Sequence, residues 1–202
     1  MTTILSDLDG VLVDSHASIM RAWRWWGAEH GVESAAIDGV QHGRPSGEVI
    51  AALVPGLDAE AESRAIDLRQ AGDTDGVIAL PGAHELLAGP EPVAIVTSCT
   101  VPLATARLRA AGLAVPDVLV TPERLSRGKP DPEGYLLAAR ELGAAPGECV
   151  VLEDAPAGIE AGRAAGMHVV GITTTHHPAE LDAHELAPSI AAWLASRNGA
   201  LR

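Results

Sequence analysis

From Pro81 onward, short apolar segments alternate with segments of helical pattern, and this alternation is the strongest constraint on the fold. Three of the helical segments are followed by a glycine, at Gly112, Gly143 and Gly166, which is typical of a helix C-terminus. The apolar segments show little polar–apolar alternation, as expected of strands buried on both faces. Alternating β and α units predict an α/β fold with an open parallel sheet covered by helices on both sides.

We expect a Rossmann-like sheet of five strands in the spatial order 3-2-1-4-5. The predicted strands are Thr3–Leu8, Pro92–Thr97, Val118–Val120, Cys149–Leu152 and His168–Ile172. The predicted helices of this part are Pro102–Ala111, Pro132–Leu142, Ala155–Ala165 and Pro188–Ser196.

The segment between the first strand and Pro81 has a different character, because no strand with a clear partner is found there. The helical patterns in it are Ser15–His30, which Gly31 would end, Ser46–Leu53 and Asp58–Ala71. We therefore expect an all-helical cap domain at 15–80, inserted into an α/β core domain formed by 1–14 and 81–202. An insertion at this point lies over the carboxyl ends of the strands, where ligands bind, and can act as a lid.

The formal net charge of −13 disfavours nucleic acids and anionic membrane surfaces as partners. The same charge would repel a phosphorylated substrate unless a local cation reverses the field in the site. No apolar run approaches the roughly 18 residues of a membrane span. Cys99 and Cys149 form no disulfide framework, and the N-terminus has no basic leader, so we expect a cytoplasmic protein. The oligomeric state is not indicated.

Two acidic residues, Asp7 and Asp9, lie where the first predicted strand ends, just before Gly10. Carboxylates this close repel each other unless a cation intervenes, and Mg²⁺ prefers such oxygen ligands. A bound Mg²⁺ would also reverse the local field and so admit an anionic substrate. An acidic turn that caps the next segment is the alternative interpretation.

Three further polar segments follow predicted strands. Ser98 and Cys99 come just before a helix, where hydroxyl and backbone N–H groups can hold an anion or simply cap the helix. Lys129 lies on a short Gly–Lys–Pro loop and is either a charge aimed at phosphate or a solvated lysine. Glu153 and Asp154 would complete an oxygen cage for a metal, although Asp154 could instead cap the next helix.

In this order, Asp7-x-Asp9-Gly, Thr97-Ser98, Lys129-Pro130 and Glu153-Asp154 resemble the motifs of the haloacid-dehalogenase superfamily of phosphotransferases. The resemblance covers roughly Ile4 to Thr175, and the helical insertion is similar to the small cap of that superfamily. Leu80–Ala83 and Val151–Ile159 are similar to segments of sugar and polyol phosphatases, including glycerol-3-phosphate and 2-deoxyglucose-6-phosphate phosphatases.

The resemblance implies a role for each of these residues. Asp7 would be the nucleophile that forms an aspartyl-phosphate, and Asp9 would act as acid and then as base. Ser98, Cys99 and Lys129 would bind the phosphoryl group, although Cys99 could also be a small neutral filler. Mg²⁺ would be held by Asp7, the backbone carbonyl of Asp9, and Asp154, with Glu153 a ligand or a partner of a ligand.

The segment His42-Gly43-Arg44 is similar to a cap segment of those phosphatases. His42 and Arg44 could contact a sugar hydroxyl or phosphate, or could be solvated loop residues. Arg44 lies one position earlier than its counterpart in several of those enzymes.

Two other functions compete with a phosphatase of a small sugar or polyol phosphate. Sugar phosphomutases similar to β-phosphoglucomutase carry a histidine five residues after the position of Asp14, where this chain has Ile19. A non-catalytic phosphometabolite-binding protein would be indicated by loss of Asp9 or Lys129, and both are present. The sequence therefore favours a magnesium-dependent phosphomonoester hydrolase.

Overall fold

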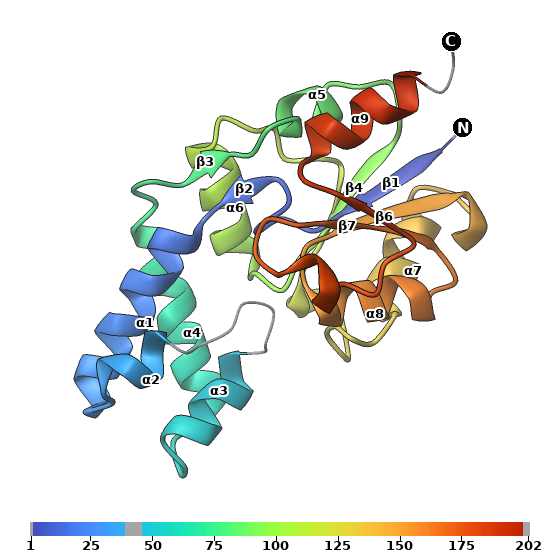
Figure 1. Cartoon of the computed structure of the whole chain (residues 1–202). Helices are drawn as coiled ribbons and strands as arrows, with labels where there is room; N and C mark the ends of the chain where they lie inside the picture. The colour runs from blue at the N-terminus through green and yellow to red at the C-terminus, as the bar shows by residue number, and fades with distance from the viewer. Residues whose placement is uncertain (1, 39–45, 200–202) are drawn as a thin grey trace.

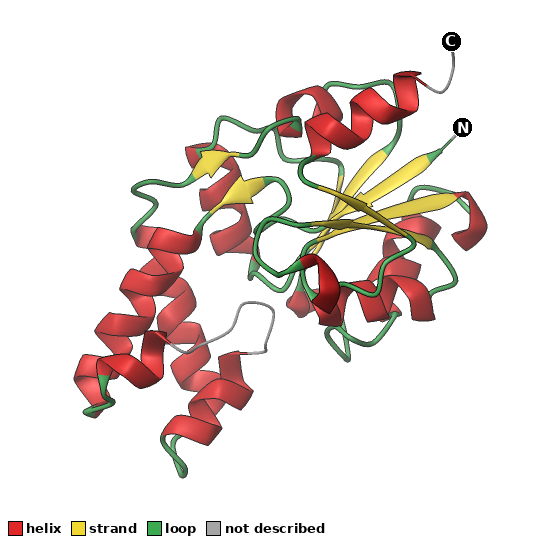
Figure 2. Cartoon of the chain, in the orientation of Figure 1, coloured by secondary structure: helices red, strands yellow, loops and turns green. Residues whose placement is uncertain are grey.

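A six-stranded parallel sheet forms the centre of the protein (Figures 1 and 2). The computed structural model describes residues 2–38 and 46–199. The strands, in spatial order, are β5 (Val118–Val120), β4 (Val93–Val96), β1 (Thr3–Ser6), β6 (Cys149–Glu153), β7 (His168–Ile172) and β8 (Glu185–Ala187). The first five confirm the predicted order 3-2-1-4-5. The edge strand β8 was not predicted, because it is three residues long and two of them are exposed.

Helices cover both faces of the sheet. On one face lie α5 (Ala83–Leu87), α6 (Val101–Ala110) and α9 (Ile190–Gly199), and on the other α7 (Glu133–Glu141) and α8 (Pro156–Ala164). Neighbouring strand residues face opposite cores, since Ile4 packs with the first set of helices and Leu5 with the second. This two-sided burial explains the apolar strand sequences. Short 3₁₀ helices lie at Pro122–Arg124, Pro146–Glu148 and Pro178–Glu180.

A separate group of four helices, here called the helical unit, lies between β1 and β4 in the sequence and beside the sheet in space (Figure 1). It consists of α1 (His16–His30), α2 (Ser34–Asp38), α3 (Ser46–Leu53) and α4 (Ala59–Gly72). The unit has its own apolar core, in which the rings of Trp23 and Trp26 pack edge to face at 5.6 Å. Gly31 ends α1 with a φ of 67°, as the sequence predicted.

An antiparallel ribbon of two short strands, β2 (Val13–Asp14) and β3 (Ile78–Ala79), joins the helical unit to the sheet. β3 lies inside 15–80, which corrects the expectation of helices alone in that segment. Two residues are too few to show a strand period in the sequence. The exact domain boundaries remain a prediction.

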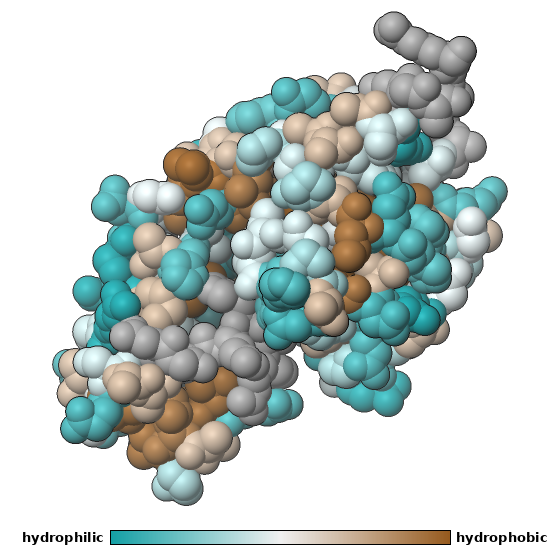
Figure 3. Space-filling model, in the orientation of Figure 1, coloured by the Kyte–Doolittle hydropathy of each residue, from teal (hydrophilic) through white to brown (hydrophobic). Residues whose placement is uncertain are grey.

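Figure 3 shows a mixed surface, with an apolar patch at the lower end of the helical unit and smaller apolar areas at the upper left and right of centre. None of the helices within the described residues is long and apolar enough to cross a membrane.

Candidate active site

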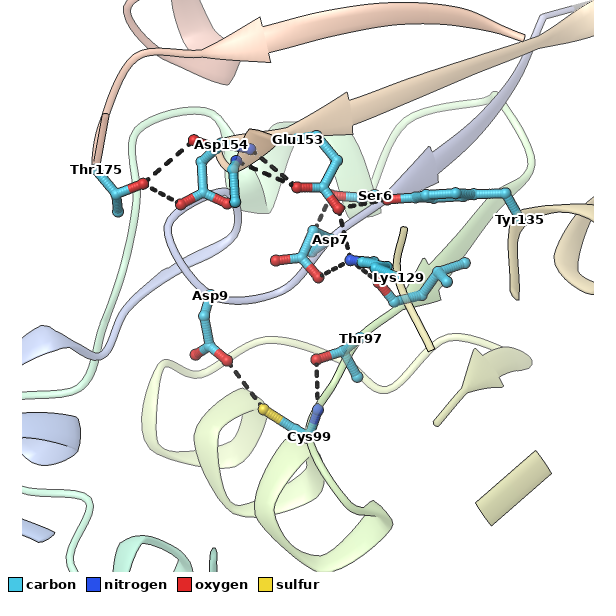
Figure 4. A network of polar contacts seen from close by, with 12 residues as sticks. Ser6, Asp7, Asp9, Thr97, Cys99, Lys129, Tyr135, Glu153, Asp154 and Thr175 are labelled. Carbon is cyan, nitrogen blue, oxygen red and sulfur yellow. Dashed lines mark hydrogen bonds and ion pairs between the residues drawn. The ribbon is translucent and has the colours of Figure 1, made fainter. Parts of the chain in front are cut away.

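The segments singled out in the sequence meet at the carboxyl ends of β1, β4 and β6, around a cavity of about 160 Å³ (Figure 4). The parallel register brings them together, since β1 lies between β4 and β6. The cavity is lined on this side by Asp7, Asp9, Ser98, Lys129, Glu153 and Asp154. Where the helical unit begins, Asp14, His16 and Ile19 also line it.

Lys129 lies between two carboxylates. Its Nζ donates to Oδ1 of Asp7 at 2.6 Å and to the backbone oxygen of Val96 at 3.0 Å, and lies 2.5 Å from Oε1 of Glu153. Burial alone would lower the pKa of Lys129, but Asp7 and Glu153 outweigh it and raise the pKa above its ordinary value. The lysine is therefore a fixed cation at the cavity wall.

Glu153 is almost fully enclosed, with 1% of its side chain exposed, and both its oxygens have donors. Oε1 accepts from the Tyr135 hydroxyl at 2.7 Å as well as from Lys129. Oε2 faces the backbone N–H groups of Asp154 and Ala155 at 3.2 and 3.4 Å. The carboxylate of Glu153 is thus an anchor for Lys129.

Two residues of the loop after β7 contact Asp154. The Thr175 hydroxyl donates to Oδ2 of Asp154, and Nδ1 of His176 lies 3.0 Å from the Asp154 backbone oxygen. A Cβ at Gly10 would lie 2.2 Å from Oδ2 of Asp154, so glycine at that position makes room for the carboxylate.

Carboxylate oxygens of Asp7, Glu153 and Asp154 lie within 4.8 Å of one another, an arrangement that could hold a metal ion. Burial is the main cause that raises the pKa of Asp7 to about 7 and that of Asp154 well above its ordinary value. A divalent cation would remove this penalty, because it stabilises the ionised carboxylates. The residues at this site therefore fit a divalent metal.

Asp9 is bound on the opposite side, against α6. Its carboxylate accepts from the Ser15 hydroxyl at 2.6 Å and the Cys99 thiol at 2.9 Å, and it forms an ion pair with Arg107. In Figure 4 the carboxylate points toward Cys99 and away from Lys129.

The predicted phosphate-binding residues differ in their surroundings. Ser98 is exposed at the cavity, whereas Cys99 is buried and its backbone N–H donates to the Thr97 hydroxyl at 3.1 Å. Burial raises the pKa of the Cys99 thiol well above its ordinary value, so the thiol stays protonated beside Asp9. Phosphate binding by Ser98, Cys99 and Lys129 remains a prediction. His42 and Arg44 lie outside the described residues.

Four residues that contact the candidate site residues were not predicted as site residues from the sequence: Ser15, Tyr135, Thr175 and Arg107. Tyr135 is the only tyrosine of the chain, and a hydroxyl on the buried face of a helix was a usable signal. Arg107 lies near the C-terminus of α6, where basic residues are common. Thr175 is the last of three consecutive threonines. Neither position carries a local signal.

Comparison with known proteins identifies the protein family. The haloacid dehalogenase-like hydrolase family matches residues 1–166, and the chain belongs to that family. Hexitol phosphatase A of Escherichia coli is 45% identical over 175 residues, which cover 83% of this chain and 81% of the relative. The 2-deoxyglucose-6-phosphate phosphatase 2 of Saccharomyces cerevisiae is 34% identical, over 85% of this chain and 80% of the relative.

The fold agrees with this assignment. A hydrolase from Pseudomonas syringae superposes with a TM-score of 0.84 and 28% identity, over 98% of this chain and 99% of that one. Within the family the chain is a phosphatase, as the resemblance of its motifs implied.

Gly158 on α8 provides a test of the Glu153 anchor. A Cβ there would lie 1.8 Å from Oε1 of Glu153, which cannot retreat without losing Lys129 and Tyr135. We expect Gly158→Ala to lower the free energy of unfolding by about 2 kcal/mol, despite the better helix propensity of alanine. Urea denaturation measures this. Gly147→Ala is the control, because nothing lies within 4 Å of a Cβ at Gly147. Equal stability of the two variants would contradict the account.

Proposed function

We propose that the protein is a Mg²⁺-dependent phosphomonoester hydrolase that acts on a small sugar or polyol phosphate through an aspartyl-phosphate on Asp7. The observation that carries the proposal is the cavity in which Asp7, Asp154 and Lys129 converge, buried carboxylates beside a fixed cation. The names of the relatives, a hexitol phosphatase and a 2-deoxyglucose-6-phosphate phosphatase, support the substrate class.

The reaction would proceed in two steps. A carboxylate oxygen of Asp7 attacks phosphorus, and the bond from phosphorus to the alkoxide of the substrate breaks. Asp9 gives a proton to the departing alkoxide and later takes one from the water that cleaves the aspartyl-phosphate. Lys129, with Ser98, would offset the negative charge on the phosphoryl oxygens.

The metal would be held by Asp7, Asp154 and the backbone carbonyl of Asp9, with Glu153 as a further ligand or as a support. Because both Glu153 oxygens already have protein donors, we favour support. When bound, Mg²⁺ supplies positive charge that draws an anionic ester into a chain of net charge −13.

The helical unit would act as a cap. His16 and Ile19 reach the cavity from α1, and Asp14 reaches it from β2, so the part of the substrate beyond the phosphate would meet that side. Ile19 also bears on the phosphomutase alternative, because it places an apolar side chain where similar mutases have a histidine. The two unpaired, buried cysteines support the proposed cytoplasmic location.

The test of this function is phosphate release from a panel of esters, with Mg²⁺ and with excess EDTA. The panel contains hexitol phosphates, hexose 6-phosphates, 2-deoxyglucose 6-phosphate, glycerol phosphates and nucleoside monophosphates. We expect release from a few of the sugar and polyol esters, and loss of that release in EDTA. Isomerisation of glucose 1-phosphate without phosphate release would replace the proposal with a mutase. Activity unchanged by EDTA would contradict the metal dependence.

Metal affinity should depend on pH. In the metal-free protein burial raises the pKa of Asp7 to about 7, so below pH 7 Mg²⁺ must displace a proton. We expect the Mg²⁺ dissociation constant to fall as pH rises from 6 to 8, by roughly tenfold per unit for each proton released, and burial raises the pKa of Asp154 as well as that of Asp7.

Isothermal titration calorimetry in two buffers of different ionisation enthalpy measures both the affinity and the protons released. An affinity independent of pH over this range would show that Asp7 is not protonated in the metal-free site.

A further inference from the structure

Arg107 is a buried cation that the proposed reaction does not use. It lies on α6, and 3% of its side chain is exposed. Nη1 forms an ion pair with Oδ2 of Asp9 and contacts Sγ of Cys99 at 2.9 Å. On its other side, Nη2 donates to Oε1 of Gln70 on α4 of the helical unit. One guanidinium thus connects the candidate acid–base residue to the helical unit.

The burial of Arg107 is not explained by a gain in stability alone. A buried guanidinium is costly to desolvate, and replacing buried ion pairs by apolar side chains is often neutral or stabilising. The Nε atom of Arg107 is buried without a hydrogen-bond partner, which adds to this cost. The contacts of this arginine therefore point to a role other than packing.

The contacts of Asp9 indicate that role. Ser15 and Cys99 each offer the Asp9 carboxylate one donor, and Arg107 offers a charged one with a fixed planar geometry. Asp67, one turn before Gln70 on α4, also interacts electrostatically with Arg107. The orientation of the Asp9 carboxylate is therefore tied to the position of α4.

We propose that Arg107 is a positioning residue, which orients the Asp9 carboxylate for proton transfer and couples that orientation to the helical unit through Gln70. This rests on the proposed function, in which Asp9 protonates the leaving alkoxide. Arg107 itself does not contact the reacting atoms. A misplaced general acid costs most when the leaving group is a poor one, since a good leaving group departs without a proton.

The experiment compares kcat/KM for two substrates, the best alkyl phosphate of the panel and p-nitrophenyl phosphate. Because kcat/KM covers only the steps up to phosphoryl transfer, it isolates the acid role of Asp9. We expect Arg107→Gln to lose roughly 10- to 100-fold on the alkyl phosphate and only a few-fold on p-nitrophenyl phosphate. Arg107→Lys, which keeps the charge, should recover part of the loss. Gln70→Met should show the same selectivity to a smaller extent.

A double-mutant cycle with Asp9→Asn decides whether Arg107 acts through Asp9. In the Asp9→Asn background, we expect Arg107→Gln to cause almost no further loss. Urea denaturation should show Arg107→Gln folded at all assay conditions. An equal loss on both substrates, or the full loss again in the Asp9→Asn background, would mean a purely structural role and overturn the inference.

If the proposed function itself is wrong, the same assays give different results. In that case the wild-type protein hydrolyses neither substrate, or Asp9→Asn itself shows no selectivity between them. If the wild type and Asp9→Asn behave as expected while Arg107→Gln matches the wild type, only the inference about Arg107 fails.

Discussion

The burial of three carboxylates close to one another is the constraint on which the rest of this site depends. Carboxylate oxygens of Asp7, Glu153 and Asp154 lie within 4.8 Å of one another, and all three residues are buried, where ionised carboxylates are costly. Lys129 offsets part of that cost, and the N–H groups that follow Glu153 offset more. The remaining cost is one that a bound cation would remove, and the proposed Mg²⁺ would then attract a phosphate ester.

The strand order of the sheet brings the members of this cluster together. Because β1 lies between β4 and β6, the residues that follow these three strands share one edge. A parallel sheet buried on both faces also gives the edge rigid support, since the strands cannot shift without disturbing two cores. The segment that forms the helical unit begins near that same edge, and the first residues of the unit line the cavity.

The strands of the sheet and most of the helices that cover it could be predicted from the sequence. Strands buried on both faces have continuous apolar sequences, as in Val93–Val96. The carboxylates could be predicted because each follows such a strand. β8 could not, since its Glu185 and Leu186 are exposed. Arg107 could not either, because its importance comes from Asp9, 98 positions away in the sequence. Contacts of that kind depend on tertiary structure alone.

The central claim is that Asp7 is the nucleophile, and trapping the phosphorylated enzyme tests it most directly. Asp9→Asn would be mixed with ³²P-labelled p-nitrophenyl phosphate and Mg²⁺, quenched in acid, reduced with borohydride and mapped by mass spectrometry. The p-nitrophenolate needs no general acid to leave, whereas loss of the base should slow breakdown of the aspartyl-phosphate. The account predicts ³²P label on the acid-quenched enzyme and, after reduction, homoserine at position 7. Both should be absent in the double variant Asp7→Asn/Asp9→Asn. Phosphate release with no modification at Asp7, or label on another residue, would contradict it.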